Sequence, residues 1–373
     1  MPTVQPGRIK GLDGLRGFAA LLVLCGHAAA FLLYETEKGL FSRTLQTSGV
    51  LGVDLFFVVS GFLITGILID GRSRPAALWT FWERRALRIL PLAVLYLSVL
   101  FAIARSPLAP LEYRSFEGWG FFLFFLGNIH IAVVGSTPPE LAIMWSLAIE
   151  EQFYLLWPFL VRAGTSLLVA RVGLLLVIVS PLLRQLTAWS LTPEAAIVLT
   201  PGRLDGLAGG ALLAVAIRSA VWPRIRQTVG ASAPIAAALS LVILAGPGLP
   251  GLHLPFPQRS WLTNLSWCVL VGGVLAEPRQ WLARLFESRL LVWFGERCYG
   301  TYVWHVLAAR ITLSLMRNVG LDSSPLNRML LWLVVVVVVV ELSWRCLEKP
   351  FMGLAQRRSG RDEGARGQPS LLS

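Results

Sequence analysis

Long apolar runs, each bounded by charged residues or by Pro and Gly, recur along this 373-residue sequence. A run of roughly 20 apolar residues is long enough to cross a bilayer as a helix that rises about 1.5 Å per residue. The composition agrees, because 55% of the residues are hydrophobic, 14% are charged and the mean hydropathy is +0.66. The sequence therefore predicts an all-α, polytopic membrane protein.

The apolar runs predict ten membrane-spanning helices with both chain termini in the cytosol. The expected spans lie near residues 14–34, 49–69, 87–105, 141–162, 171–189, 203–217, 230–247, 260–276, 299–318 and 328–347. With this orientation, Lys and Arg gather mainly in the cytosolic segments, as the positive-inside rule requires. An eleventh run that starts at Gly118 is broken by Asn128 and His130. We expect it to be re-entrant or interfacial, because counting it as a span would send the Arg-rich C-terminal segment outward.

One domain is expected to occupy residues 1–352, followed by a disordered basic cytosolic tail at 353–373. The first apolar run resembles a signal peptide in its basic start, but Arg16 and His27 interrupt it and it is long enough to span, so we expect a retained helix. Residues 277–297 interleave arginines with apolar residues. This pattern favours a helix lying in the membrane surface, with a solvated connector as the alternative.

The distribution of charge and the spacing of the cysteines bear on nucleic-acid binding, disulfides and metal binding. The net charge of +12 would suggest nucleic acid in a soluble protein, but here the basic residues fall in short segments between apolar runs. The four cysteines lie in or beside expected spans and lack metal-binding spacing. We therefore expect no nucleic-acid partner, no disulfide and no metal site.

Arg16 and His27 are out of place in the first apolar run, because an ionisable group inside a bilayer costs roughly 2.5 kcal/mol or more. The two are eleven residues apart. At about 100° per residue, this spacing returns to within about 20° of the same helical face and rises about 16 Å. With Arg16 at the cytosolic boundary, His27 is expected near the midplane of the membrane.

Polar residues of two other spans reach a similar depth. Asp54 and Ser60 lie on the second span at depths of about 7 and 16 Å from the outer surface. Glu150 and Glu151 lie on the span at 141–162, which also enters from outside. Three helices are thus expected to bring an imidazole, a hydroxyl and carboxylates to one layer.

A second polar group gathers near the expected cytosolic face. Asp13 and Arg16 lie there, and Arg85 and Arg88 share one helical face because they are three residues apart. Arginines at this density suit a multiply charged anion, since a guanidinium group forms paired hydrogen bonds with phosphate. A solvated positive-inside loop explains the arginines around Arg85 equally well at this stage.

The motifs resemble those of the membrane-bound acyltransferase-3 family, bacterial O-acyltransferases that modify carbohydrates and some small molecules. The resemblance covers nearly the whole chain and rests on these matches: Arg-x10-His at Arg16 and His27, GVDLFFVVSGFLI from Gly52, Arg-x-x-Arg at Arg85 and Arg88, WSLAIEEQFYLLWP from Trp145, RLDGLAGG from Arg203, and CYGTYVWH ending at His305. Cys298 departs from the family's Ser-Tyr-Gly pattern, so no role for a hydroxyl carries over. In contrast to longer members of the family, this protein is expected to carry no extracytoplasmic esterase-like domain.

The resemblance implies transfer of an acyl group, usually acetyl, from cytosolic acyl-CoA to a hydroxyl group. The implied acceptor is a surface carbohydrate, a lipid-linked sugar or a small metabolite, and the implied location is the bacterial inner membrane. Besides acyl-CoA as co-substrate, no cofactor is expected. Membrane lipid is an expected partner, and glycan-assembly proteins are further candidates.

The candidate site residues fall into three groups. The catalytic candidates are His27 as general base, Glu150 to orient it, and Asp54 as the alternative to Glu150. The donor-binding candidates are Arg16, Asp13, Arg85, Arg88, His305 and Tyr299. The acceptor-side candidates are Trp145, Ser146, Arg203 and Asp205.

A near-neutral pKa suits an imidazole to take a proton from an attacking hydroxyl, and a transient acyl-histidine is a variant of the same role. The alternative for His27 is interhelical hydrogen bonding, and for His305 it is packing. Asp205 is equally explained by a helix start. Ser60 followed by Gly61 is better explained as a close-packing pair than as a nucleophile.

A competing function class is a proton-coupled transporter of a sugar or glycan intermediate, with His27, Glu150 and Asp54 as a proton relay. Such transporters usually show interrupted helices in two related halves. No internal repeat is visible in this sequence. A non-catalytic export scaffold is a third and weaker interpretation, and turnover of acyl-CoA would separate the enzyme from both.

Overall fold

The computed structural model describes residues 9–31, 40–74, 77–107, 109, 111–135, 137–245, 256–277, 281–320 and 324–354. Most of the expected domain lies within these ranges, whereas its first eight residues and the expected tail from residue 355 onward lie outside them. The part of the chain that is described is all-helical and contains no strand. The predicted fold class is correct at this level.

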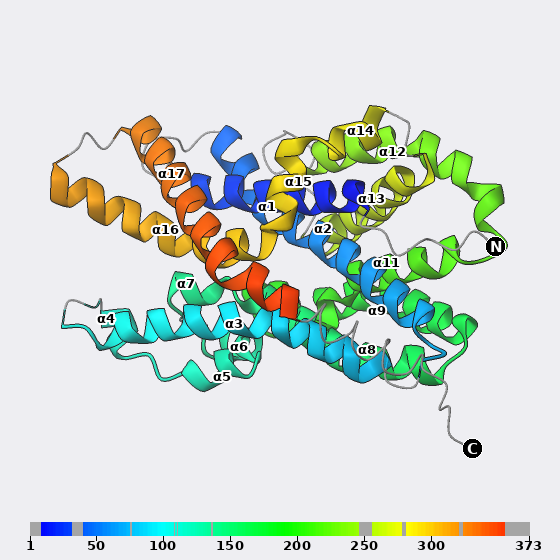
Figure 1. Ribbon diagram of the computed structural model, residues 1–373, viewed down its shortest axis with the longest axis horizontal. Coiled ribbons are helices and arrows are strands. Elements are labelled where there is room, and N and C mark those ends of the chain that lie inside the picture. The colour runs from blue at the N-terminus through cyan, green and yellow to red at the C-terminus, as the bar shows by residue number, and fades with distance from the viewer. Residues whose placement is uncertain are drawn as a thin grey trace, which may run out of the picture.

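Ten of the described helices are 14 residues or longer, and each predicted span falls on one of them. These helices are α1 (Lys10–Phe31), α2 (Leu40–Asp70), α3 (Ala77–Arg105), α8 (Trp145–Ala163), α9 (Ser166–Ser190), α11 (Leu204–Ile217), α12 (Trp222–Ala245), α13 (Phe256–Ala276), α16 (Cys298–Val319) and α17 (Pro325–Ser343). Figure 1 shows α3 and α16 lying roughly along the long axis of the molecule, whereas α17 crosses it obliquely.

Short helices connect the long ones. They are α4 (Leu111–Arg114), α5 (Trp119–Leu123), α6 (Gly127–Val134), α7 (Pro139–Ala142), α10 (Pro193–Val198), the 3-10 helix η1 (Thr200–Arg203), α14 (Trp281–Phe286), α15 (Arg289–Glu296) and the π-helical turn η3 (Trp344–Glu348). Helices α4 to α7 lie together beside the C-terminal half of α3, at the lower left of Figure 1.

Within the described residues, six helical segments are long and apolar enough to cross a membrane: α1, α2, α3, α9, α12 and the continuous segment made by α17 and η3. The other four long helices differ from these in length or polarity. Helix α11 has only 14 residues, and α8 carries Glu150 and Glu151. The chain is thus a multi-pass membrane protein, while the count of ten spans and the cytosolic location of the termini remain predictions.

The run that starts at Gly118 forms two short helices, α5 and α6, instead of one long helix. The break between them includes Phe125, whose φ of 55° lies in the left-handed region that side chains other than glycine rarely adopt. Helix α6 has 8 residues, which is too short to span a bilayer. The amide of Asn128 is buried and donates to the Thr200 hydroxyl, 2.9 Å away.

The segment predicted as one surface helix at 277–297 also divides, into α14 and α15. Its apolar face is split, because Leu282 and Phe286 are buried whereas Trp281 and Leu285 are exposed. Both helices pack against α1. The approach is close, since a side chain at Gly17 of α1 would collide with the carbonyl group of Leu291.

Helices α1, α2 and α11 form the centre of the fold. Helix α1 packs against α2, α15 and α16, and α2 packs against α11. The α2–α11 contact depends on glycine, because a side chain at Gly61 would strike the Leu207 carbonyl and one at Gly210 would strike the Val58 carbonyl. Such small-residue contacts let transmembrane helices approach closely. The sequence correctly favoured packing for Gly61.

Candidate active site

Two histidines from different helices meet in the interior. The ring centroids of His27 on α1 and His305 on α16 are 4.6 Å apart, and the rings meet edge to face at 74°. His305 is fully buried, whereas His27 is only half-buried. The sequence placed these residues in separate roles, as base and donor ligand, and did not anticipate that their rings touch.

Backbone carbonyls fix the tautomer of both imidazoles. Nδ1 of His27 lies 3.0 Å from the Val23 carbonyl oxygen, and Nδ1 of His305 lies 2.7 Å from the Tyr302 carbonyl oxygen. A carbonyl oxygen can only accept, so each Nδ1 carries the hydrogen and each Nε2 keeps its lone pair. Nε2 of His305 is buried and has no hydrogen-bond partner among the described residues. In both rings, Nε2 is therefore the nitrogen that can accept a proton.

Three predicted donor-binding arginines are brought together. The guanidinium group of Arg88 interacts electrostatically with those of Arg16 and Arg85, although Arg16 lies on α1 and the others lie on α3. All three side chains are half-buried. Within the described ranges, none of the three forms an ion pair with a carboxylate. The three guanidinium groups therefore form a cluster of positive charge whose N–H groups are not used in ion pairs with described residues.

Carboxylates surround the arginines at longer range. Asp13 and Glu150 interact electrostatically with Arg16, and Glu151 does so with Arg85. Arg84, the neighbour of Arg85, is exposed instead. Arg85 and Arg88 therefore differ from Arg84 in their surroundings. Their three-residue spacing had already placed Arg85 and Arg88 together on one helical face.

Glu150 is held by a hydroxyl group. Oε1 of Glu150 accepts a hydrogen bond from Ser60 Oγ at 2.6 Å, and the carboxylate lies in the field of Arg16 and Arg85. The structure therefore places Glu150 beside the arginines. Its proposed action on His27 remains a prediction, because the described contacts assign the orientation of the imidazole to the Val23 carbonyl.

Asp54 belongs to a buried ion pair. Its Oδ1 lies 2.5 Å from Nη2 of Arg203, and both side chains are completely buried. Ser260 donates to the second carboxylate oxygen at 3.0 Å. These partners account for the burial of Asp54 without a catalytic role. The ion pair also joins Asp54, a catalytic candidate, to Arg203, an acceptor-side candidate.

A second buried pair lies next to the first. Asp205 binds Arg184 at 2.5 Å, and Arg184 also donates to the Gly202 carbonyl oxygen at 2.6 Å. Helix starts favour acidic residues, as the sequence suggested for Asp205, but the pairing with Arg184 was missed. The available signal was an arginine inside the apolar run at 171–189, which required a buried partner.

The remaining candidates surround these groups. Trp145 lies beneath the Arg203 guanidinium, 5.4 Å from its ring centroid. Ser146 Oγ is 2.6 Å from the hydroxyl of Tyr302, which in turn donates to the Ile143 carbonyl at 2.6 Å. The Tyr299 hydroxyl donates to the Ile89 carbonyl at 2.9 Å and so joins α16 to α3. Tyr302 is a site residue that sequence reasoning missed.

The described residues contain no group of three or more His, Cys, Asp or Glu side chains that could hold a metal ion. The described groups instead offer imidazole nitrogens, guanidinium groups and hydroxyls. Such groups can move protons and bind anions.

The fold and site define a class, a multi-pass helical membrane protein with a buried imidazole pair beside an arginine cluster. The chain belongs to the acyltransferase domain family, whose model matches residues 9–347. The resemblance found in its motifs is therefore confirmed.

Curated relatives carry related names. The chain is 29% identical to the putative peptidoglycan O-acetyltransferase YrhL of Bacillus subtilis over 374 residues, which is 92% of this chain and 54% of the relative. It is 28% identical to the peptidoglycan O-acetyltransferase OatA of Listeria monocytogenes, with 92% and 55% covered, and 27% identical to the O-acetyltransferase OatA of Staphylococcus aureus, with 93% and 57% covered. The chain thus spans about half the length of these relatives. No solved structure matches.

Proposed function

We propose that this protein is an integral-membrane O-acyltransferase that moves an acyl group, in the first instance acetyl, from cytosolic acyl-CoA to a hydroxyl group of a carbohydrate. The observation that carries the proposal is the contact of His27 with His305 on the two helices that also border the arginine cluster. Membership of an acyltransferase family supports it, as do relatives named as peptidoglycan O-acetyltransferases. The bacterial inner membrane is the proposed location.

The arginine cluster is proposed to bind the phosphates of the donor. Acyl-CoA carries several phosphate groups, and arginine binds phosphate through paired hydrogen bonds. Arg16, Arg85 and Arg88 have no ion pair within the described structure that would have to break first. With the proposed topology, these residues border the cytosol, where acyl-CoA is made.

His27 is proposed as the general base. Its Nε2 takes the proton of the acceptor hydroxyl while the hydroxyl oxygen bonds to the acyl carbon of the thioester. The carbon–sulfur bond then breaks, and the CoA thiolate leaves and takes up the proton from His27. Such base catalysis contributes typically about 10²- to 10⁴-fold to the rate.

His305 is proposed to support His27. Its unpartnered Nε2 can accept a proton or a hydrogen bond in the same small volume, so a proton on one ring can be shared with the other. The same geometry allows a variant in which one imidazole carries the acyl group transiently before the hydroxyl attacks. Both variants need His27 and His305 together.

Purified protein in liposomes tests the proposal. Acetyl-CoA with a labelled acetyl group is supplied on one side of the membrane, and a soluble glycan with free hydroxyls is supplied on the other. We expect labelled acetyl ester on the glycan and release of free CoA, both dependent on His27 and both resistant to uncouplers of a proton gradient. Uncoupler-sensitive glycan movement without CoA release would favour the transporter instead.

A further inference from the structure

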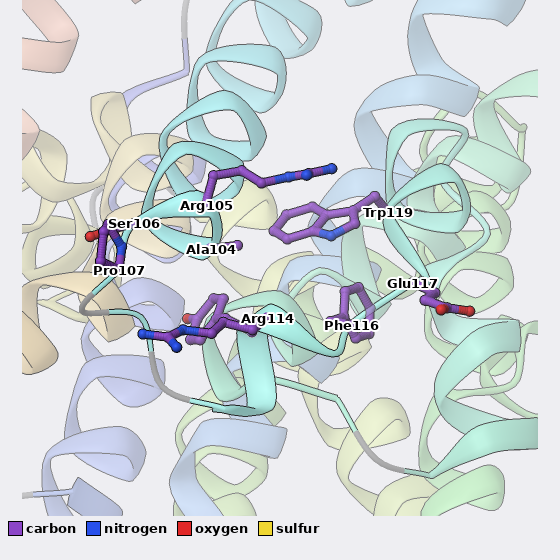
Figure 2. Close-up of a pocket in the computed structure, with 9 residues that line it drawn as sticks. Ala104, Arg105, Ser106, Pro107, Arg114, Phe116, Glu117 and Trp119 are labelled. Atoms are coloured by element: carbon purple, nitrogen blue, oxygen red, sulfur yellow. The ribbon is translucent and has the colours of Figure 1, made fainter.

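A hollow opens where α3 ends and the connection to α5 begins (Figure 2). Its volume is about 680 Å³, and its lining includes Arg105, Tyr113, Arg114, Phe116, Glu117 and Trp119. This volume lies within the range of about 300–1,000 Å³ that is usual for sites of small organic ligands. With the topology proposed above, the hollow faces the outside of the cell, on the side opposite the arginine cluster.

Aromatic contacts hold Trp119 in place. The ring of Trp119 lies 5.3 Å from that of Phe101 and 5.5 Å from that of Phe116, and both contacts are edge to face. Phe116 is itself packed against His130 at 5.2 Å. Because these neighbours already restrict the indole, little further side-chain entropy is lost when a ligand binds against it.

Charged groups lie at the rim of this aromatic surface. Figure 2 shows Arg105 extending over the edge of Trp119, with Glu117 and Arg114 on either side. The guanidinium group of Arg105 also lies 5.0 Å from the Phe101 ring centroid. Arg105, Arg114 and Glu117 are exposed, so they can exchange water for a ligand at little cost. Two guanidinium groups and one carboxylate leave a net positive charge.

This combination fits an acidic sugar. A pyranose ring presents C–H groups on one face, which pack on an aromatic ring, while its hydroxyls and acyl oxygens require polar partners at the edge. A carboxylate on the sugar matches the excess of guanidinium groups, and a carboxylate of the protein accepts from hydroxyls. A neutral lipid chain carries no group that could pair with Arg105, Arg114 or Glu117.

The wall of the hollow is joined to the helix that carries His305. The guanidinium group of Arg310 lies over the Tyr113 ring, 5.1 Å from its centroid, and it is paired with the carboxylates of Glu140 and Glu112. Arg310 follows His305 by five residues on α16, a rise of about 7.5 Å. A chain held in the hollow therefore lies beside the outward half of the helix that carries His305.

We propose that this hollow is a binding site for an acidic glycan, which it holds by stacking on Trp119 and by the charges of Arg105, Arg114 and Glu117. The proposal rests on the proposed function, since the glycan is the acyl acceptor. It also assigns first contact with the acceptor to residues other than Arg203 and Asp205, which are committed to buried ion pairs.

The test uses the full-length protein in nanodiscs and a soluble peptidoglycan fragment of alternating N-acetylglucosamine and N-acetylmuramic acid. Substitution Trp119→Ala should raise the dissociation constant for this fragment, measured by microscale thermophoresis, at least tenfold. It should raise the acceptor KM in acetyl transfer by the same factor while the KM for acetyl-CoA stays unchanged. Trp189→Ala is the matched control, because Trp189 is 78% exposed near the end of α9 and is not part of the hollow.

Charge substitutions identify the ligand. Arg105→Gln with Arg114→Gln should weaken binding of the acidic fragment but not of a neutral N-acetylglucosamine oligomer, at an unchanged thermal midpoint. Unaltered fragment binding in Trp119→Ala would overturn the proposal. So would a Trp119→Ala phenotype that appears only when anionic lipid is present, because it would assign the hollow to a lipid headgroup. Because binding is measured directly, the two proposals can fail separately. If the unmodified protein binds the fragment and Trp119→Ala weakens that binding, but no acetyl transfer occurs, the proposed function is refuted and the hollow remains a glycan-binding site.

Discussion

Substitution Asp54→Asn should destabilise the protein strongly. The change preserves the size of the side chain but removes a charge that lies 2.5 Å from Arg203, where both side chains are completely buried. Arg203 would then keep a buried charge with its principal partner gone. Removing one partner of such a pair typically costs about 3–5 kcal/mol, because the other charge remains desolvated.

A double substitution separates the ion pair from other effects. Asp54→Asn combined with Arg203→Gln removes both charges and leaves polar groups that can still bind Ser260, which contacts both side chains now. The double variant should therefore lose less stability than the sum of the single variants. Coupled neighbours show interaction energies of roughly 0.5–3 kcal/mol, and we expect the upper part of that range for this pair.

The assay is equilibrium unfolding in mixed detergent micelles, followed by circular dichroism, with acetyl transfer measured on the same preparations. The matched control is Asp70→Asn, which breaks an ion pair on the same helix α2. In that pair, Asp70 is 55% exposed and binds Arg218 at 2.6 Å. Exposed pairs contribute at most about 1 kcal/mol, so this control should unfold nearly as the unmodified protein does.

The result that would refute the structural role of Asp54 is specific. If Asp54→Asn unfolds at the same detergent composition as the unmodified protein yet abolishes acetyl transfer, Asp54 acts in catalysis. The catalytic role predicted for Asp54, as the alternative to Glu150, would then be correct. Loss of activity that parallels loss of folded protein, with partial recovery in the double variant, supports the ion pair.

Two further predictions concern the donor site and the topology. Substitution Arg85→Lys or Arg88→Lys keeps the charge but loses the planar fork, so it should raise the KM for acetyl-CoA by about tenfold or more, whereas Arg84→Lys, at an exposed neighbour, should not; an equal KM in all three would make these arginines topology determinants only. A reporter that is active only outside the inner membrane should be silent when fused after Ser373, and an active fusion would contradict the ten-span map.

Much of the helical layout could be predicted from the sequence because the bilayer imposes a length on apolar segments. Each expected span coincides with a helix, including α9 and α17, whose apolar runs leave little choice. The prediction was less complete where short helices lie against other helices. The break at Phe125 and the division of the segment at 277–297 depend on tertiary contacts, which local periodicity does not record.

The candidate site was predictable in its members but not in its pairings. His27 and Arg16 were identified because each is costly in an apolar run. The contact between His27 and His305 joins helices that are far apart in the sequence, so no spacing rule could reveal it. The burial of Arg203 against Asp54 likewise depends on how α2 lies beside η1 and α13.

The most direct test of the proposed mechanism is acetyl transfer by the variant His27→Gln. Glutamine retains an amide that can form hydrogen bonds in place of the imidazole, whose Nδ1 lies 3.0 Å from the Val23 carbonyl oxygen, but it cannot act as a base near neutral pH. Cys25→Ser, an exposed change two residues earlier on α1, is the control.

We expect His27→Gln to fold, to bind acetyl-CoA with unchanged affinity, and to lose about 10²-fold or more of its acetyl-transfer rate. Cys25→Ser should retain the full rate. Acetyl transfer by a well-folded His27→Gln protein at a rate close to that of the unmodified protein would contradict the account and would show that the histidine only holds helices together.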